Sequence, residues 1–469
     1  MKHLVLVLLA FWGAHSPARA QSIRFEKDSL TQVFARAGQQ NKPVFVLFSP
    51  PPAPANTPAA LKKMRSESGL NAPAVVAALN KEFLSKELPF GKAETVALAR
   101  KYAVSTYPAY LYFGPDASLL FRSYGNAAKE ERYLKDVQAF RDAQADPGNL
   151  SHLEQEYRQG NWSAEFLKRY IGKHRQLGLR VEPVLLEAYV QQLPVRAFDQ
   201  AEEVLFVAEN GPVVGSKGYQ LSRLNYKLYD SLFRAQPLDR RMAINNLIIS
   251  NTVAQAIATK NAVLAAQGAN FARGTWPKDF NRSFRAYEGN MLRFYSAVKD
   301  TANYLRSAVL FYDRINTSVT ADSARKAVAA LQAFRQEQAA NRQRLATTAA
   351  QPGGMAPNVG VRTTVTRVAM GLVPPASFLQ ELNNGAWAVY QTGTRNSQHL
   401  VRAMLWSKRT VDLDPTSYNY DTLAHLLYRL RFFSEAEAMQ QQAIAVARKD
   451  QTATSTYEQE LQKIKKRTL

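Results

Sequence analysis

The chain of 469 residues contains no cysteine. This absence excludes disulfide bonds, thiolate-based zinc and iron–sulfur sites, thiolate nucleophiles and dithiol redox centres. Histidine is scarce, with six residues, and none has the spacing of H-E-x-x-H or of another close metal-binding pair. Glycine-rich phosphate loops and the G-x-S-x-G hydrolase motif are also missing. We therefore expect no metal, no cofactor and no catalytic residues.

Long hydrophobic runs are absent as well. No stretch approaches the roughly 20 apolar residues that a transmembrane helix needs, so no transmembrane segment is expected. The apolar run 4–12 is short, follows Lys2, and precedes Ala18-Arg19-Ala20, which has the pattern of a cleavage site. These features predict a secretory signal peptide at residues 1–20 and an exported protein, either periplasmic or extracellular.

Acidic residues are in deficit: 38 Asp and Glu stand against 60 Lys and Arg, which gives a formal net charge of +22. The excess is spread along the chain, and the basic tail at 463–467 is interpreted as a solvated helix end. No basic stripe with interleaved aromatic residues is present, so a nucleic-acid partner is not expected. Diffuse positive charge suits solubility or weak association with an anionic envelope surface.

Apolar residues make up 46% of the chain, which is enough to bury globular cores, and the length favours two or three domains. Residues 21–145 alternate between strand and helix patterns. The expected order is a short strand at 22–25, a helix capped by Asp28, a buried strand at 44–48, helices at 61–67 and 74–79, a strand from 83, a helix at 94–102, a hairpin of strands 109–113 and 118–124, and a helix at 129–143.

Three segments in this order carry a family resemblance: 42–48 (KPVFVLF), Lys62-Lys63-Met64, and 102–113 (YAVSTYPAYLYF). Residues 22–144 resemble the thioredoxin family of exported bacterial proteins. The resemblance implies that Pro108 is the cis-proline beside the family's active site and that Tyr107 offers its backbone to an extended peptide. A second interpretation is that Pro108 serves the turn alone.

The same resemblance exposes two departures from the family. Its two cysteine positions are occupied by Pro58 and Leu61, and the place of a buried proton-relaying carboxylate holds Leu47. Because thiol–disulfide exchange requires a thiolate, the domain is predicted to be redox-inactive. The longer proline-rich loop 49–58 either presents a polyproline II binding edge or closes a vacated active site.

Beyond residue 145 the patterns are helical: a domain at 146–346, a flexible connection at 347–364 and a last region at 365–469. One helix carries an apolar face made of Phe280, Phe284, Tyr287, Met291, Phe294 and Val298. Arg282, Arg285 and Arg293 lie off that face and are interpreted as solvated surface residues.

The last region resembles a tetratricopeptide helix pair at Leu423, Ala424, Leu427, Ala436 and Ala443, preceded by a degenerate unit at 382–415. Arg431 stands where the repeat usually has glycine, and Gln440 where it prefers an aromatic residue. Stacked helix pairs of this kind imply protein or peptide partners.

The predicted fold class is therefore an α/β, thioredoxin-like domain followed by an all-α, tetratricopeptide-like region. The hypothesis for function is a non-enzymatic scaffold or chaperone-like factor of the cell envelope that binds a protein or peptide. The alternatives are a thiol–disulfide oxidoreductase, disfavoured because cysteine is absent, and a hydrolase or transferase built on convergent carboxylates or histidines of the helical half. The oligomeric state and the identity of the partner stay open.

Overall fold

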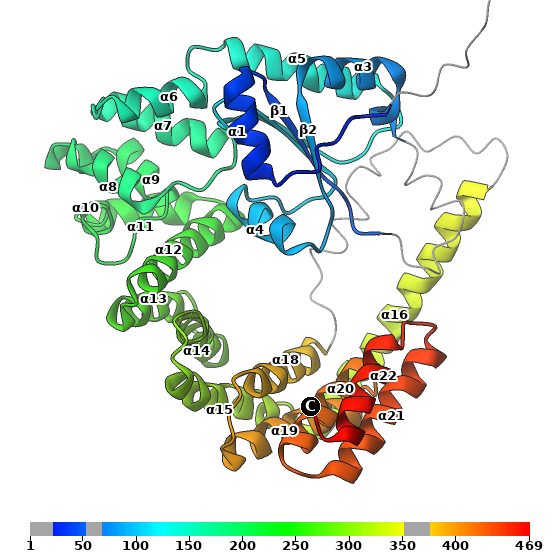
Figure 1. The fold of residues 1–469 in the computed structure, drawn as a ribbon. Coiled ribbons are helices and arrows are strands. Elements are labelled where there is room, and N and C mark those ends of the chain that lie inside the picture. Colours follow the sequence, from blue (N-terminus) through cyan, green and yellow to red (C-terminus); the bar gives the residue numbers. More distant parts are fainter. Residues whose placement is uncertain (1–21, 53–67, 351–375) are drawn as a thin grey trace, which may run out of the picture. The chain divides into compact units, whose positions relative to one another are not determined.

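The computed structural model describes residues 22–52, 68–350 and 376–469 (Figure 1). The expected leader 1–20, the two positions that the resemblance assigns to cysteines (Pro58 and Leu61) and residues 351–364 of the expected connection lie outside these ranges. The chain divides into two compact units. The first, which we call the sheet unit, ends at Asn161 and adds residues 169–180; the second, the helical unit, takes 162–168 and everything from Val181 onward.

The sheet unit contains four strands and its own set of helices. Its elements are α1 (Leu30–Gln40), β1 (Val44–Phe48), the 3-10 turn η1 (Gly69–Asn71), α3 (Pro73–Glu82), β2 (Leu84–Leu88), α4 (Ala93–Lys101), β3 (Ala109–Phe113), β4 (Leu119–Tyr124), α5 (Glu131–Ala145), α6 (Leu150–Arg158) and the second half of α7 (Ala164–Gln176).

The strands form one mixed sheet in the order β2-β1-β3-β4. Strand β1 pairs with β2 in parallel, with Leu47 opposite Glu87, and with β3 in antiparallel orientation, with Phe48 opposite Ala109. The expected hairpin is present as β3 and β4, with a register irregularity at Tyr112 and Phe113. An α/β sheet at the N-terminal end of the chain is thus confirmed.

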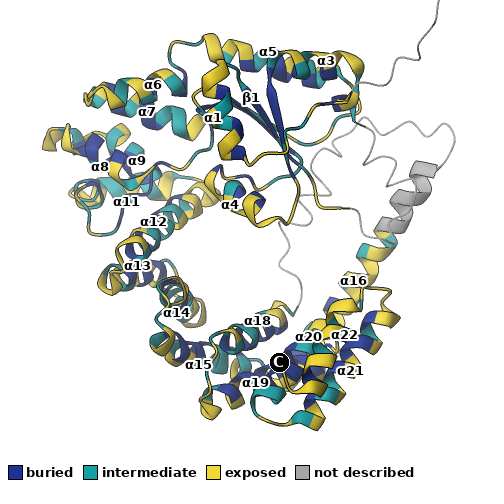
Figure 2. Cartoon of the chain, in the orientation of Figure 1, coloured by how far each residue is buried: buried dark blue, intermediate teal, exposed yellow. Residues whose placement is uncertain are grey.

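An aromatic core covers one face of this sheet. Phe45, Tyr110 and Tyr112 point from β1 and β3 toward the apolar sides of α3 and α5, and all three are almost fully buried. Because side chains alternate along a strand, Phe113 lies on the opposite face, where its ring contacts Phe34 of α1 at a centroid distance of 5.0 Å. Figure 2 shows that β1 is buried along most of its length. Both faces of the sheet are therefore packed, as its apolar run predicts.

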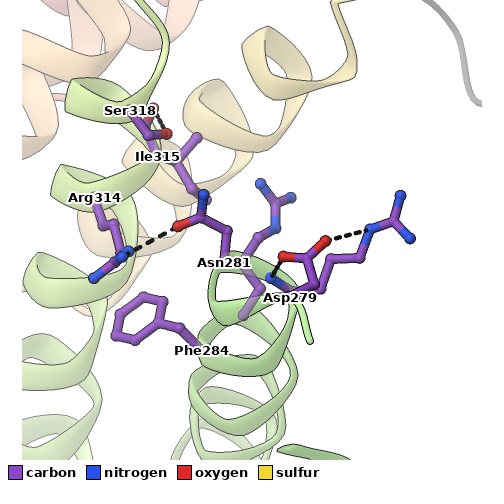
Figure 3. Close-up of a pocket in the computed structure, with 8 residues that line it drawn as sticks. Asp279, Asn281, Phe284, Arg314, Ile315 and Ser318 are labelled. Carbon is purple, nitrogen blue, oxygen red and sulfur yellow. Dashed lines mark hydrogen bonds and ion pairs between the residues drawn. The ribbon is translucent and has the colours of Figure 1, made fainter. Parts of the chain in front are cut away.

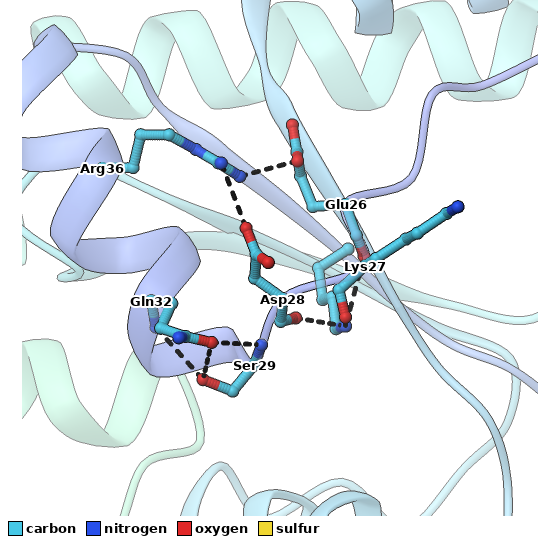
Figure 4. Close-up of polar contacts among 7 residues, drawn as sticks. Glu26, Lys27, Asp28, Ser29, Gln32 and Arg36 are labelled. Carbon is cyan, nitrogen blue, oxygen red and sulfur yellow. Dashed lines mark hydrogen bonds and ion pairs between the residues drawn. The ribbon is translucent and has the colours of Figure 1, made fainter.

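A buried lysine fastens the segment before α1 to β2 (Figure 4). Lys86 is 8% exposed, and its ammonium group donates to the backbone carbonyls of Glu26 at 3.2 Å, Lys27 at 3.3 Å and Asp28. Arg36 adds ion pairs to the Glu26 carboxylate at 2.6 Å and the Asp28 carboxylate at 3.1 Å. Three carbonyls satisfy the three donors of an ammonium group, which is how this cation tolerates burial without a carboxylate partner.

Two local expectations at this end of the chain are wrong. The cap of α1 is Ser29 rather than Asp28: Ser29 and Gln32 form a reciprocal capping box, while Asp28 pairs with Arg36. The expected strand 22–25 is reduced to a single bridge between Phe25 and Ser85. The backbone around residues 26–28 turns to meet the ammonium of β2, so the segment stops pairing as a strand.

The helical unit begins with the first turn of α7. The helices that follow are α8 (Pro183–Gln191), α9 (Ala201–Glu209), α10 (Lys217–Leu221), α11 (Tyr226–Ala235), α12 (Leu238–Thr259), α13 (Ala262–Gly274), α14 (Phe280–Ala297), α15 (Thr301–Ser318), α16 (Ala321–Ala350), α18 (Ser377–Gln391), α19 (Ser397–Leu413), α20 (Ser417–Arg429), α21 (Phe433–Lys449) and α22 (Ser455–Lys466), with the 3-10 turn η2 (Val195–Asp199) before α9. Residues 347–350 of the expected connection belong to α16.

Helices of this unit pack mainly on their neighbours in the chain. Contacts run in series from α12 to α13, α14 and α15, and then from α18 through α19, α20 and α21 to α22, with α15 packed on both α18 and α19. Close approach depends on small residues: a Cβ atom added at Gly385 of α18 would lie 2.5 Å from the ring of Tyr312 on α15. A mostly helical region after the sheet is thus confirmed.

The two positions that depart from the tetratricopeptide pattern have specific surroundings. Arg431, between α20 and α21, adopts a left-handed conformation with φ of 69°. Gln440 of α21 is fully buried, and its amide nitrogen donates to the Asp421 carboxylate at 2.8 Å and to the Tyr457 carbonyl at 3.2 Å. Arg431 thus occupies backbone geometry that normally favours glycine, and Gln440 replaces an apolar contact by hydrogen bonds.

In the described parts of the chain, no helix combines the length and the apolar character required to cross a membrane.

Candidate functional site

Tyr107 and Pro108 lie immediately before β3, and the bond between them is cis. The carbonyl of Pro108 accepts a hydrogen bond from Gly125 at 2.8 Å, which extends the β3–β4 pairing by one step. Both residues are half-buried. The backbone N–H and C=O of Tyr107 form no hydrogen bond within the described residues. A peptide-binding role for this pair stays a prediction.

An exposed aromatic residue accompanies Tyr107. Phe90, which follows β2, is 45% exposed, and its ring meets that of Tyr107 edge to face at 5.2 Å. The two rings come from segments that leave β2 and enter β3. They form an accessible apolar contact at one end of the sheet.

A carboxylate does lie beside Leu47, although on another strand. Glu87 of β2 is the register partner of Leu47 and accepts a hydrogen bond from the Ser49 hydroxyl. The sequence alone did not point to Glu87, because its place next to Leu47 depends on the pairing of β1 with β2. Loop residues 53–58 lie outside the described ranges, so the two interpretations of that loop stay open.

A second candidate lies in the helical unit, between the start of α14 and the end of α15 (Figure 3). It is a pocket of about 460 Å³, which we call the arginine pocket; its lining residues are Asp279, Asn281, Arg282, Phe284, Arg285, Arg314, Ile315 and Ser318. Sequence reasoning treated Arg282 and Arg285 as solvated surface. The pocket arises because Arg314, on a different helix, lies against the same end of α14.

The three arginines of this pocket are held in different ways. Arg314 stacks on the rings of Phe280 and Phe284, with its guanidinium carbon 4.7 Å and 4.6 Å from the centroids, and donates to Asn281 Oδ1 at 3.1 Å. Arg282 lies 4.8 Å from the Trp276 ring and 3.4 Å from the Asp279 carboxylate. Arg285 pairs with Glu381 of α18. The pocket lining therefore carries an excess of positive charge.

Phe280 departs from its expected place in the helix core. It is 71% exposed, whereas Met291 and Phe294 of the same face are buried. The partner helices cover only the C-terminal part of that face, and the first turn of α14 projects its ring beside Arg314.

A third cluster joins α18, α20, α21 and α22 around His425. His425 is 4% exposed, and its ring meets the stacked rings of Trp387 and Tyr390 edge to face, at centroid distances of 5.1 Å and 5.2 Å. Its Nδ1 lies 2.8 Å from the Asp421 carbonyl oxygen, and its Nε2 lies 3.5 Å from the Glu460 carboxylate. Burial raises the pKa of Asp421 above its ordinary value, although the neighbouring His425 opposes the shift.

This cluster meets one condition of the hydrolase alternative, since carboxylates converge on a histidine. The His425 side chain is nevertheless only 5% exposed, and it does not line the arginine pocket. Its geometry suits a polar contact that fixes the packing of four helices. Among the described residues, no set of three or more potential ligands is placed to hold a metal ion.

Comparison with known proteins adds no assignment: no family model matches the chain, and no curated protein matches it significantly.

Proposed function

We propose that this chain is a redox-inactive, thioredoxin-like protein of the cell envelope that binds polypeptides as a scaffold or chaperone-like factor. The observation that carries the proposal is the serial packing of helices α12 to α15 and α18 to α22. Arrays in which each helix contacts mainly its chain neighbours have extended surfaces, and such surfaces are commonly used to bind proteins and peptides.

The sheet unit supports the thioredoxin-like part of the proposal. A helix precedes the central strand β1, and a proline stands at the head of β3 in a mixed four-stranded sheet. This is the element order on which the resemblance rests. Since the chain has no cysteine, thiol–disulfide exchange is excluded, and what the fold retains for a function is peptide contact near Tyr107 and Phe90.

The helical unit supports the tetratricopeptide-like part. Helices α20 and α21 pack closely as a pair, and Ala424, Ala436 and Ala443 are fully buried in or near their contact. Small buried residues allow two helices to approach, which is the property that the repeat pattern requires. Polypeptide binding by this unit needs no reactive side chain, in agreement with a non-enzymatic role.

One assay separates polypeptide binding from the oxidoreductase alternative. Insulin is reduced by dithiothreitol, and aggregation of its B chain is followed by light scattering with the mature protein in molar excess. A protein that binds unfolded chains delays the onset of scattering or lowers its amplitude. A thiol–disulfide oxidoreductase accelerates the onset.

We expect a delay, with serum albumin at the same concentration as the control for non-specific crowding. Acceleration over the reaction without protein would contradict redox inactivity. A time course identical to that of the albumin control would contradict binding of unfolded polypeptides.

A further inference from the structure

The arginine pocket is large enough to hold part of a ligand. Its volume of about 460 Å³ falls within the range of about 300–1,000 Å³ found for pockets that hold small ligands. This volume accommodates one or two side chains. A larger partner would therefore place only one or two of its side chains in this pocket.

The arginines of the pocket are oriented by aromatic rings. Stacking on Phe280 and Phe284 restrains the plane of the Arg314 guanidinium without using its N–H groups, one of which donates to Asn281. Arg282 is stacked in the same manner on Trp276. A guanidinium held in this way loses little side-chain freedom when it binds a planar anion such as a carboxylate.

Exposed apolar side chains surround these charges. Phe280 is 71% exposed and Trp276 is 38% exposed. Leu310, one turn before Arg314 on α15 and hence on the same helix face, is 59% exposed. A ligand that matches both features carries negative charge next to an aromatic or aliphatic group.

We propose that the arginine pocket binds an acidic side chain of a partner polypeptide, with an adjacent apolar side chain of the same partner packed on Phe280 and Phe284. This proposal rests on the proposed polypeptide binding and specifies which side chains of the polypeptide are recognised. Arg314 holds the carboxylate, Arg282 contributes a second guanidinium that it shares with Asp279, and Asn281 adds an amide donor at the side of the pocket.

The test measures fluorescence anisotropy of a fluorescein-labelled peptide in which Asp alternates with Phe, at constant ionic strength. A second peptide replaces each Asp by Asn. We expect the Asp peptide to bind the mature protein at least tenfold more tightly than the Asn peptide, because charge-assisted hydrogen bonds to arginine are lost with the carboxylates.

Variants locate the binding site. Arg314→Gln is expected to weaken binding of the Asp peptide about tenfold and to leave binding of the Asn peptide unchanged. Arg306→Gln is the matched control, since Arg306 lies exposed on the same helix outside the pocket and its removal changes the net charge equally. Arg282→Gln, at a side chain 64% exposed, keeps the test valid if loss of the Arg314 stacking disturbs folding.

Two results would overturn the assignment: equal loss with Arg306→Gln, which indicates a diffuse charge effect, or equal affinity for both peptides. If the mature protein delays insulin aggregation in these cases, polypeptide binding stands without this pocket. If it neither delays aggregation nor binds either peptide, the proposed function fails first.

Discussion

Two cationic sites, one in each unit, have opposite surroundings. In the sheet unit, Lys86 is buried, and its ammonium group donates hydrogen bonds to three backbone carbonyls. In the helical unit, Arg282 and Arg314 lie at a pocket and rest on aromatic rings. A buried cation bound to backbone fixes a fold, whereas a stacked cation at a pocket is available to a ligand.

The cores differ as well. The core of the sheet unit joins residues far apart in the chain, such as Phe45 and Phe140, through one sheet. The helical unit instead has several separate cores, each shared by a few packed helices; the one that holds Leu426 joins α14, α15, α18, α19 and α20. The destabilisation caused by removing a core side chain should therefore spread through the sheet unit, and should stay within one cluster of helices in the helical unit.

The largest effect is expected for Phe45→Ala, which removes a fully buried ring from the centre of the sheet. A cavity of this kind costs about 3–5 kcal/mol of unfolding free energy. Hydrogen exchange measured by mass spectrometry should rise in all four strands and in α3 and α5. The helical-unit counterpart, Leu426→Ala, should raise exchange in the helices of its own cluster, α14, α15 and α18 to α20, and leave α8 to α13 unchanged; a spread through the whole helical unit would remove the contrast.

The next effect is expected for Lys86→Met, which keeps the apolar stem and deletes the ammonium group. Three carbonyls then lose their donor, and because residues 26–28 are partly exposed, water replaces some of the lost bonds. We expect the free energy of unfolding, measured by urea denaturation, to fall by about 1–3 kcal/mol. The control in the helical unit is Arg314→Gln, for which a loss as large as that of Lys86→Met would show that the arginine is a structural residue.

A smaller, pH-dependent effect is expected at Asp116, in the β3–β4 turn. Burial raises the pKa of this carboxyl, but hydrogen bonds from Ser151 at 2.6 Å and Ser118 at 2.8 Å outweigh it, so the pKa is lowered from 3.8. A lowered folded-state pKa stabilises the protein above the unfolded-state pKa of about 4, and this contribution disappears as the pH falls through the folded-state value.

Asp116→Asn should therefore lower the unfolding free energy by roughly 0.5 kcal/mol at pH 7, where the carboxylate is ionised but exposed to screening by solvent, and by less at pH 3. Urea denaturation of both proteins at the two pH values measures the difference. A cost that is the same at pH 7 and pH 3 would show that the carboxylate charge plays no part in holding α6 to the turn.

Local sequence patterns predicted most of the sheet unit because its signals are short-range. The apolar run of β1 and the turn between β3 and β4 lie where the sequence places them. The cap of α1 was assigned to Asp28 instead of Ser29 because both residues are good caps, and the competing partner of Asp28, Arg36, lies a helix length away. Pairing across strands, as for Glu87 and Leu47, has no local signature.

The arginine pocket could not be predicted from one helix. Arg282 and Arg285 lie off the apolar face of α14, which is typical of solvated residues. What makes a pocket of them is Arg314, 29 positions beyond Arg285 and brought close by the antiparallel packing of α14 and α15. The exposed ring of Phe280 could not be predicted either, because its helix position indicated burial.

The smallest effect is expected for Arg431→Gly, which tests whether the helical unit stores local strain. An L-residue in the left-handed conformation costs about 1–2 kcal/mol, and Arg431 has φ of 69°. Glycine relieves this cost but gains freedom in the unfolded chain, which cancels about 0.4–1 kcal/mol of it. We expect a net gain of about 0.5 kcal/mol, seen as a rise in melting temperature of about 1–2 °C.

The matched control for Arg431→Gly is Gln441→Gly, at an exposed position inside α21. Glycine in a helix interior costs about 1 kcal/mol, so this variant should melt at a lower temperature than the parent protein. Opposite signs for the two variants would attribute the gain to the left-handed conformation between α20 and α21. A loss at both positions would instead mean that the Arg431 side chain contributes contacts worth more than the strain of its backbone.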